Sequence, residues 1–487
     1  MLLATLLVMW ATTQPQAEND YWLLSRIGQS IWIHQSIPST LLFPYTEARD
    51  FHYNAHEWLP ALLFFAFNRL FEQATLGFLL GILGVFLFAA LSFTAYRRSG
   101  NSLSLSLGLG LLAMLGQNYR HFLRPELFTL FFLLAYLVSL EQLIKKLSTI
   151  NILMPIGLAA LWANTHGSFI LTLPLALIYT IDRMQYYGKC EASSQNIPNR
   201  LNLYAAFWLT LPLLVFMASL CTPFGIELWK FSLGFSHDSL AKKEIVEWMS
   251  LLDIRSYSVV GIYPGLAFFA INLAIVIIYR RKLSLRVIGT SMLFLALAAW
   301  GNRFLVYQGI IFCWVASLLF GAGTNTGNWK SEYKRLLILF VATAIGLLFC
   351  YKFGNMNAAS PFNARSNVLF SHGISAALQD QTIKGNVFNS YDLGGELIYR
   401  GYPRLKPSID SRIDSYGDQY YFWHESLLDE PYKFQAFISR WNVQYLLLTR
   451  PDFDRWQKMP LTVKNLCNLV ATDHLIFFHQ CRATAEP

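Results

Sequence analysis

The segment 258–279 reads SVVGIYPGLAFFAINLAIVIIY and carries no charged side chain. It is long enough to cross the apolar core of a bilayer as a helix, which takes roughly 20 residues. Backbone N–H and C=O groups find no outside partner in lipid, so such a segment is expected to be helical. Arg280, Arg281 and Lys282 follow directly, as basic residues often do on the cytoplasmic side of a span.

The same apolar pattern recurs along most of the 487-residue chain. Hydrophobic residues make up 54% of it and charged residues only 14%, against roughly 25% charged in an ordinary soluble domain. This composition excludes a disordered chain, a coiled coil and a single soluble globule. We predict an α-helical polytopic membrane protein with about 11 transmembrane helices. The expected spans lie near residues 1–14, 74–96, 103–117, 122–142, 151–163, 167–182, 201–221, 258–279, 286–300, 303–323 and 335–353.

Two segments near the N-terminus do not fit a standard span. Residues 59–72 are apolar but short and end in charge, so we predict an interfacial helix that leads into the second span. Residues 1–14 are also short for a span. Two alternatives to a short first span stay open: a cleaved signal peptide, or a first span that a start codon assigned too late has clipped.

The distribution of charge predicts the orientation of the chain. With the N-terminus in the cytoplasm, the inner loops carry 14 Lys and Arg and 2 Asp and Glu, whereas the outer loops carry 9 and 10. Basic residues concentrate on the cytoplasmic side of membrane proteins. The net charge of +9 is therefore read as a consequence of membrane orientation, with no nucleic-acid partner implied, and the C-terminus is expected on the outer face.

The apolar pattern ends near residue 353, and residues 354–487, here called the tail, have balanced charge. Short alternating helices and strands predict a small α/β soluble domain in the tail. The expected organisation is a transmembrane domain (1–353), with a long first outer loop (15–58), followed by the tail as an extracytoplasmic domain. The predicted helices of the tail are 368–378 and 432–441, and its predicted strands are 386–391, 396–399, 445–448, 466–471 and 475–479.

Two of the six cysteines, Cys467 and Cys481, lie at equal distances from His474, the middle of a predicted hairpin. Directly opposed residues on paired strands can reach disulfide distance. The outer face of a membrane is an oxidising place, so we predict one Cys467–Cys481 disulfide. The remaining cysteines are expected to be buried thiols: Cys190, Cys221, Cys313 and Cys350.

Charged residues gather at the predicted outer ends of the spans. Glu18 and Asp20 follow the first span, where a carboxylate can act as a general base or the pair can hold a divalent cation such as Mg or Mn. Arg120, Arg124 and Arg303 can clamp a phosphate, because guanidinium matches phosphate oxygens in a two-pronged way. Solvated loop carboxylates and snorkelling arginines are the plain alternatives.

Further polar candidates occur in the same outer regions. His56 and Glu57 are neighbours in the first outer loop, and Glu57 is an alternative base. Asn164, His166 and Glu247 lie in later outer loops and are predicted to contact the donor or the acceptor. A packing role is the alternative for His166.

The tail contains one charged motif, Asp410-x-Arg412-x-Asp414. We interpret it as turns and ion pairs, with binding of an acceptor as the alternative. The sequence contains no P-loop, zinc-binding helix or nucleophile elbow. A soluble nucleotide-sugar enzyme is therefore disfavoured.

The order and spacing of several short motifs can be compared with those of known families. They are Glu18-Asn19-Asp20-Tyr21-Trp22, His56-Glu57-Trp58, Arg124-Pro125-Glu126-Leu127-Phe128, Trp162-Ala163-Asn164-Thr165-His166-Gly167, Thr222-Pro223-Phe224-Gly225 and Glu244-Ile245-Val246-Glu247-Trp248. This order resembles the GT-C superfamily of membrane glycosyltransferases, in a bacterial branch distantly like the protein O-mannosyltransferases and aminoarabinose transferases. The resemblance covers nearly the whole chain and includes 385–395 (GNVFNSYDLGG) and 409–417 (IDSRIDSYG) in the tail.

The resemblance implies transfer of a sugar from a polyprenyl-phosphate-linked donor to an envelope glycan, lipid or protein acceptor. It implies reaction on the outer face of a bacterial inner membrane. Glu18-x-Asp20 matches an acidic motif of the superfamily, so Asp20 is the preferred catalytic carboxylate and Glu18 its helper or a metal ligand. Glu57, beside His56, is the alternative base.

Two other classes of function stay open. A transporter or lipid flippase is expected to show ionisable residues near the midpoints of spans and internal repeats with broken helices. A non-catalytic envelope scaffold is expected to use its tail for binding a partner. The sequence shows no internal repeat, and its polar groups collect at the outer ends of the spans, which favours the transferase.

Overall fold

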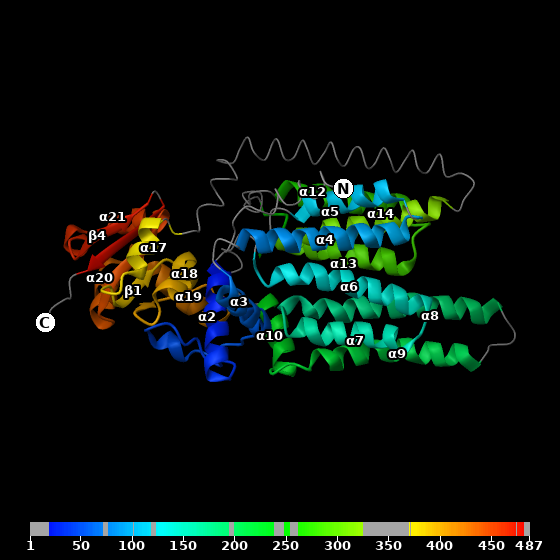
Figure 1. Cartoon of the computed structure of the whole chain (residues 1–487), viewed down its shortest axis with the longest axis horizontal. Helices are drawn as coiled ribbons and strands as arrows, with labels where there is room; N and C mark the ends of the chain where they lie inside the picture. Colours follow the sequence, from blue (N-terminus) through cyan, green and yellow to red (C-terminus); the bar gives the residue numbers. More distant parts are fainter. Residues whose placement is uncertain are drawn as a thin grey trace. The chain divides into compact units, whose positions relative to one another are not determined.

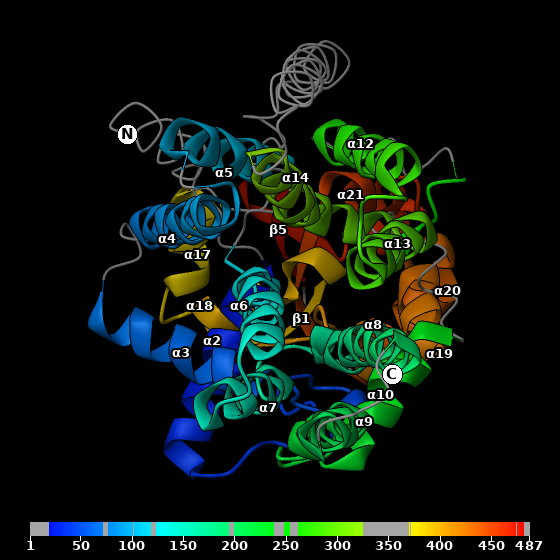
Figure 2. The same ribbon diagram turned by 90° about the vertical axis from the view of Figure 1, so that its right-hand side faces the viewer.

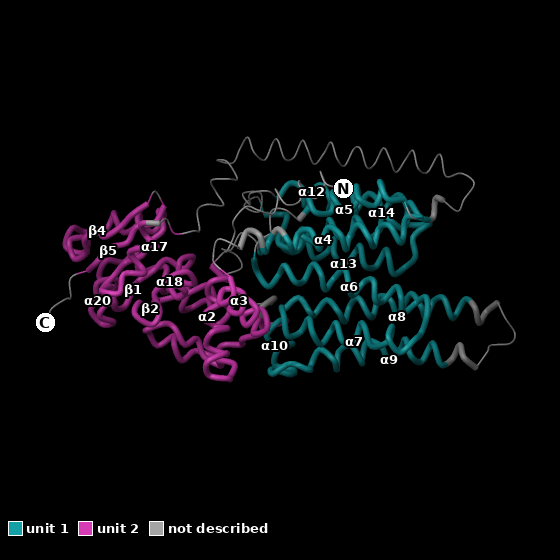
Figure 3. Tube along the Cα trace, in the orientation of Figure 1, with its two compact units in different colours: residues 1–15, 75–232, 242–361 teal, residues 16–74, 233–241, 362–487 magenta. Residues whose placement is uncertain are grey.

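The computed structural model describes residues 19–71, 76–100, 102–117, 123–193, 199–237, 248–253, 262–324, 370, 372–473 and 475–481. Most of the described residues are helical, and a small sheet lies in the C-terminal part of the chain (Figure 1). The chain divides into two compact units (Figure 3). Unit 1 comprises Met1–Pro15, Thr75–Ser232 and Lys242–Pro361, and unit 2 comprises Gln16–Ala74, Leu233–Ala241 and Phe362–Pro487.

Unit 1 is built from long apolar helices, which Figure 2 views along their axes. Helix α4 packs against α5 and α14, α8 packs against α9 and α13, and α7 packs against α6 and α9. The short helix α10 (Ile226–His237) follows α9. The long helices are α4 (Leu76–Arg98), α5 (Leu103–Gln117), α6 (Glu126–Lys145), α7 (Thr149–Ala163), α8 (Thr172–Ser193), α9 (Asn199–Ser219), α12 (Ile262–Tyr279), α13 (Leu285–Trp300) and α14 (Gln308–Thr324).

Four helical segments of unit 1 are long and apolar enough to cross a membrane: Glu126–Lys145, Gly167–Lys189, Ile262–Tyr279 and Asn302–Gly321. Shorter apolar helices accompany them, and nine of the eleven predicted spans coincide with helices. The other two predicted spans, 1–14 and 335–353, lie outside the described residues. The membrane-helix character of the chain is therefore shown, and the number eleven stays a prediction.

Unit 2 joins two parts of the sequence that are far apart. Helices α2 (Asn19–His34) and α3 (Trp58–Leu70) pack against each other, and α2 also packs against α18 (Gly394–Gly401) of the tail. The sequence assigns 15–58 to the membrane domain as an outer loop, whereas the structure groups residues 16–74 with the tail. The predicted interfacial segment 59–72 is helical as α3, and its place at a membrane interface stays a prediction.

The tail contains a five-stranded sheet with the order β2-β1-β3-β5-β4. Strands β2, β1 and β3 are parallel, and β5 is antiparallel to both β3 and β4. The strands are β1 (Gly385–Asn389), β2 (Leu405–Pro407), β3 (Val443–Thr449), β4 (Cys467–Thr472) and β5 (Ile476–Cys481). The helices are α17 (His372–Gln379), α18 (Gly394–Gly401), α19 (Ile413–Ser426), α20 (Pro431–Arg440), α21 (Arg450–Gln457) and α22 (Leu461–Lys464).

Helices cover both faces of this sheet, and the alternation of side chains along β3 shows how. Tyr445 and Leu447 pack into a core with residues of α17 and α18, while Leu446 and Leu448 pack into a second core with residues of α20 and α21. Successive side chains of a strand point to opposite faces. Both faces of β3 are therefore buried, and the tail is a three-layer α/β fold.

Both predicted helices of the tail and four of its five predicted strands agree with the structure. The predicted strand 396–399 is wrong, because these residues lie within helix α18. The sequence ELIY suits a strand locally, but its glycine pair begins a helix whose first N–H groups find an acceptor elsewhere in the chain. The three-residue strand β2 and the helices α19, α21 and α22 were not predicted. Residues 368, 369 and 371 of the predicted helix 368–378 lie outside the described residues.

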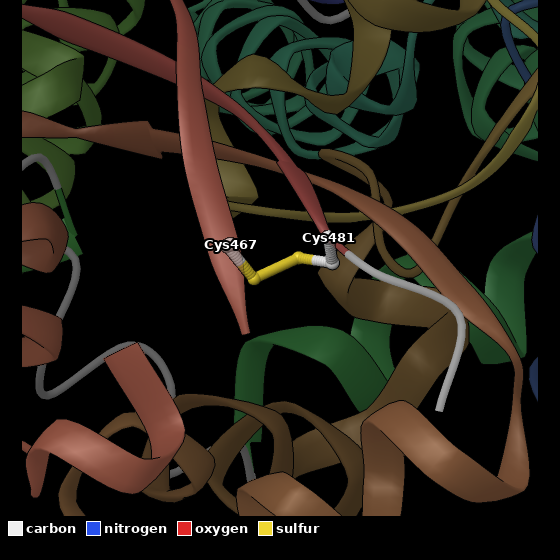
Figure 4. Close-up of a disulfide and its surroundings, with 2 residues drawn as sticks. All are labelled: Cys467 and Cys481. Atoms are coloured by element: carbon white, nitrogen blue, oxygen red, sulfur yellow. A yellow bond between two sulfur atoms is a disulfide. The ribbon is translucent and has the colours of Figure 1, made fainter. Parts of the chain in front are cut away.

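Strands β4 and β5 form the predicted hairpin, and Cys467 stands opposite Cys481 in its register. The two sulfur atoms are bonded at 2.05 Å, and the Cα atoms lie 3.9 Å apart (Figure 4). Both residues are buried in the core that α20 and α21 share with the sheet. The structure thus contains the disulfide expected from the spacing of the two cysteines.

Candidate functional site

The predicted site residues are divided between the two units. Glu18, Arg120 and Glu247 lie outside the described residues. Unit 2 contains Asp20, His56 and Glu57, and unit 1 contains Arg124, Asn164, His166 and Arg303.

Asp20 lies in the first turn of α2, and its neighbour Asn19 joins this turn to the tail. The Asn19 side-chain oxygen accepts hydrogen bonds from the backbone N–H groups of Gly395 at 2.5 Å and Glu396 at 3.2 Å. These groups belong to the first turn of α18, where N–H groups have no partner within the helix. A Cβ atom at Gly395 would lie 2.2 Å from the Asn19 carbonyl oxygen, so glycine permits the close approach.

The hydroxyl of Tyr391 lies within electrostatic reach of Asp20 and of carboxylates of the tail. Burial raises the pKa of Tyr391 well above its ordinary value, and the negative charge of Asp20 is the next largest cause. The other carboxylates that raise this pKa belong to the tail: Asp392, Asp414 and Asp410. The N-terminal acid and the tail acids therefore form one acidic region within unit 2.

A buried ion pair forms one wall of this region. Arg412 donates from Nε to one oxygen of Asp410 at 2.8 Å and from Nη2 to the other at 2.7 Å. Asp410 is fully buried and Arg412 is 6% exposed. Burial lowers the pKa of Arg412, but the charge and hydrogen bonds of Asp410 outweigh it and raise this pKa above its usual range. Arg412 therefore remains charged.

Arg412 also holds the N-terminal segment against the tail. Its Nη2 donates to the carbonyl oxygen of Leu41 at 2.7 Å, and its guanidinium lies 4.6 Å from the centre of the Tyr53 ring. Nearby, the hydroxyls of Thr46 and Tyr420 are 2.7 Å apart. The buried Nη1 of Arg412 has no hydrogen-bond partner within the described part of the chain. The ion-pair interpretation of the tail motif is thus correct, and the pair also fixes the loop that carries His56.

His56 and Glu57 contribute to the same region. The carbonyl oxygen of Asn54 lies 3.1 Å from His56 Nδ1, so Nδ1 donates this hydrogen bond. Nε2 lies 3.8 Å from Glu57 Oε1. Burial raises the pKa of the Asp414 carboxyl, although the charges of His56 and Arg412 lower it. The region therefore holds several groups suited to proton transfer.

A metal site does not emerge from the described residues. No group of three or more His, Cys, Asp or Glu side chains among them could hold a metal ion. The predicted partner of Asp20, Glu18, lies outside that part of the chain. Binding of Mg or Mn by Glu18 and Asp20 therefore stays a prediction.

Arg303 of unit 1 is held by an acid and an aromatic ring. Its guanidinium lies 3.6 Å from the Glu126 carboxylate and 4.1 Å from the centre of the Trp248 ring. Glu126 is buried, so this pair is shielded from water. A phosphate would compete with Glu126 for Arg303. Arg124 lies two residues before the start of α6, and its carbonyl oxygen accepts a hydrogen bond from the Leu127 N–H at 3.0 Å.

The two remaining candidates of unit 1 close the ends of helices. His166 Nδ1 accepts from the backbone N–H of Ser168 at 3.1 Å and lies 3.2 Å from the Thr129 hydroxyl. The Asn164 side chain donates to the carbonyl oxygen of Cys221 at 2.7 Å and so ties α7 to the segment after α9. These contacts match the packing role that the sequence left open for His166.

The structure adds a charged cluster that the sequence did not single out. Arg286 at the start of α13 lies 3.1 Å from Glu141 on α6 and 3.1 Å from Asp182 on α8, and the Tyr179 hydroxyl donates to Glu141 at 3.0 Å. The sequence signal for this cluster is an acidic residue at the C-terminal end of each of two predicted spans, Glu141 in 122–142 and Asp182 in 167–182. Opposite charges compensate each other here, as charges within apolar helices usually do.

No protein-family model matches this chain, and no curated protein is significantly similar to it.

Proposed function

We propose that this chain is a membrane glycosyltransferase that moves a sugar from a polyprenyl-phosphate-linked donor to an envelope glycan, lipid or protein acceptor. In this proposal it lies in the bacterial inner membrane with eleven spans. Its N-terminus is inside, and its tail and the reaction are on the outer face. The apolar helices of unit 1 support a lipid-linked substrate, because such a donor reaches the protein from the bilayer.

The observation that carries the proposal is the grouping of Asp20 with the acids of the tail. Asn19 ties the turn that bears Asp20 to α18, and Asp20 is the largest electrostatic influence on Tyr391 of the tail. A lone carboxylate in a loop is usually a solvated side chain. A carboxylate on a turn that is hydrogen-bonded to a second helix has the fixed position that general-base catalysis needs.

In the proposed reaction, Asp20 accepts the proton of an acceptor hydroxyl or amine. The acceptor atom then bonds to the anomeric carbon of the sugar from the face opposite the phosphate. The bond between this carbon and the phosphate oxygen breaks, and the lipid phosphate leaves with the electron pair. This single displacement inverts the anomeric centre and needs one base.

The other polar residues have distinct proposed roles. Glu57 and His56 are the alternative proton acceptors, and Arg412 positions the segment that carries them. Arg124 and Arg303 are the proposed phosphate ligands on unit 1, where guanidinium stabilises the charge that develops on the leaving oxygen. Arg120, Asn164, His166 and Glu247 remain donor or acceptor ligands by sequence alone.

Replacement of Asp20 by Asn tests the proposal. A positioned general base contributes roughly 100-fold or more to rate, so Asp20→Asn is expected to lower transfer by about that factor. In cells, the polyprenyl-phosphate sugar should accumulate and the envelope glycan profile should match that of a gene deletion. Asp50→Asn is the matched control, because Asp50 is an exposed acid of the same segment.

Mass spectrometry of the envelope glycans and of the lipid-linked sugars gives both readouts. Protein amounts must be equal in the two strains, since lower expression would mimic lost catalysis. An Asp20→Asn strain that restores the normal glycan profile at normal protein level would refute the base assignment. A deletion strain with unaltered glycans and lipid-linked sugars would refute the transferase itself.

A further inference from the structure

A polar pocket lies at the amino ends of the three parallel strands, in unit 2. Its volume is about 420 Å³, within the range of roughly 300–1,000 Å³ found for small-molecule sites. The residues that line it are Lys384, Gly385, Asn386, Pro403, Arg404, Lys406 and Gln444. Three of them are cationic and none is acidic, although the tail as a whole has balanced charge.

The cations of this pocket are not neutralised by ion pairs. Lys384, Arg404 and Lys406 have no carboxylate within 4 Å in the part of the chain that the structure describes. Asp380 is the nearby acid that feels the charge of Arg404, and its Oδ1 already accepts two hydrogen bonds from Thr382. The pocket therefore keeps a net positive charge.

Arg404 is fixed in place by the backbone around it. Its Nη1 donates to the carbonyl oxygens of Asp380 and Ile383 at 2.6 and 2.7 Å, and its Nη2 donates to that of Leu378 at 3.0 Å. These bonds hold the turn that leads into Lys384. The guanidinium supplies a fixed charge, whereas the two lysines supply mobile donors.

Neutral groups add a further donor. The side-chain oxygen of Gln444 accepts from the backbone N–H of Asn386 at 2.6 Å, which leaves the Gln444 amide nitrogen as the free end. A Cβ atom at Gly385 would lie 2.3 Å from that oxygen, and the φ of this residue is +146°, so both space and backbone conformation favour glycine. Gln444 can thus lie across the backbone and present N–H to the pocket.

We infer that this pocket binds an oxyanion, the phosphate group of a phosphorylated sugar or of an anionic lipid headgroup. Three cations, an amide donor and the absence of a lining carboxylate match the acceptor-only oxygens of phosphate. The inference does not depend on the transferase chemistry, since none of these residues belongs to the acidic region around Asp20.

Protection of lysines from an amine-acetylating reagent, measured by mass spectrometry on the full chain in nanodiscs, tests the inference. In phosphatidylcholine nanodiscs, glucose 1-phosphate should protect Lys384 and Lys406, and glucose should not. If phosphatidylglycerol in the nanodisc protects them and the soluble phosphate does not, the ligand is a lipid headgroup. Lys458 and Lys464, which lie elsewhere in the tail, serve as internal controls.

A variant that removes two positive charges measures how much the lysines contribute to the affinity for phosphate. One cationic residue near an anionic group contributes about 1 kcal/mol, so Lys384→Gln with Lys406→Gln is expected to weaken phosphate binding about 30-fold. Lys458→Gln with Lys464→Gln removes the same charge outside the pocket and should change affinity less than 3-fold, a margin on the order of the screened long-range effect. Equal protection of all four lysines under every condition, or equal affinities of the two double variants, would overturn the inference.

Discussion

Replacement of Arg412 by Met tests whether the buried ion pair fixes the N-terminal segment on the tail. The methionine fills much of the same space but leaves Asp410 without its partner. Asp410 is fully buried, and breaking a buried pair on one side typically costs about 3–5 kcal/mol. The loss also removes the hydrogen bond to the Leu41 carbonyl oxygen, so residues near Leu41 should detach.

Pulse proteolysis in urea, with a tag on the C-terminus, measures this loss in the full chain in nanodiscs. With a urea dependence of about 2 kcal/mol per M, a cost of 4 kcal/mol lowers the midpoint of tail cleavage by about 2 M. Arg450→Met is the matched control. Arg450 pairs with Asp454, but both side chains are about half exposed, and such pairs contribute roughly 0–1 kcal/mol.

A double variant separates the effect of an unpaired buried charge on the cleavage midpoint from the effect of lost packing. Asp410→Asn together with Arg412→Met removes both charges, and neutral replacement of a buried pair is often nearly neutral in stability. The double variant should therefore recover most of the midpoint. If Arg412→Met lowers the midpoint no more than Arg450→Met does, the reasoning about this pair is wrong.

Three further predictions concern unit 2. Asn19→Ala removes the acceptor for two N–H groups of α18. It should lower the free energy of unfolding by about 1 kcal/mol and speed hydrogen exchange over Asn19–His34. Asn468→Ala, at an exposed strand position, is the control and should change neither quantity. Cys467 and Cys481 should resist alkylation until reductant is added, and reduction should destabilise the tail by about 3 kcal/mol as measured by the cleavage midpoint. Burial lowers the pKa of His424 from 6.5 to about 3. Between these two pH values the folded state keeps His424 neutral, while the unfolded chain binds a proton. The stability of the tail should therefore fall as the pH drops from about 6.5 toward 3, and His424→Gln should make this fall less steep.

The helices of unit 1 are predictable because a single apolar segment in a bilayer can satisfy its backbone hydrogen bonds only as a helix. Residues 258–279 predict a helix, and α12 occupies Ile262–Tyr279. The hairpin of the tail is predictable for a similar reason, since two cysteines equidistant from one turn can pair only if the strands are in register. Local composition is sufficient in both cases.

Helix α2 could not be predicted in the same way, because its partners are remote in sequence. Tyr21 packs on Phe64 of α3 with ring centres 4.7 Å apart, and Trp22 packs on Tyr399 of α18 at 4.6 Å. A helix buried on more than one side has no simple apolar stripe. The error at 396–399 has the same origin, since the acceptor for the first N–H groups of α18 is Asn19.

The sequence singles out residues in both parts of the candidate site but does not show how they are joined. Asp20, His56 and Glu57 stand out as charged residues in a long loop, and Arg412 is interpreted as part of turns and ion pairs, with acceptor binding as the alternative. Its contact with the Leu41 carbonyl oxygen spans 371 positions of the sequence. A single sequence has no signal for such a pairing, because the local motif is satisfied equally well without it.

The parallel strands of the tail carry different ionisable groups at their two ends, which bears on how the proposed reaction is divided. An aspartate stands three residues after the end of each parallel strand: Asp392 after β1, Asp410 after β2 and Asp452 after β3. The cationic pocket lies at the other end of the same strands. Asp410 is paired with Arg412 and Asp452 with Arg455, so the end with the aspartates holds both charges, and the proposed phosphate ligands Arg124 and Arg303 belong to unit 1. In the proposed reaction the end with the aspartates serves the acceptor, from which a proton has to be removed.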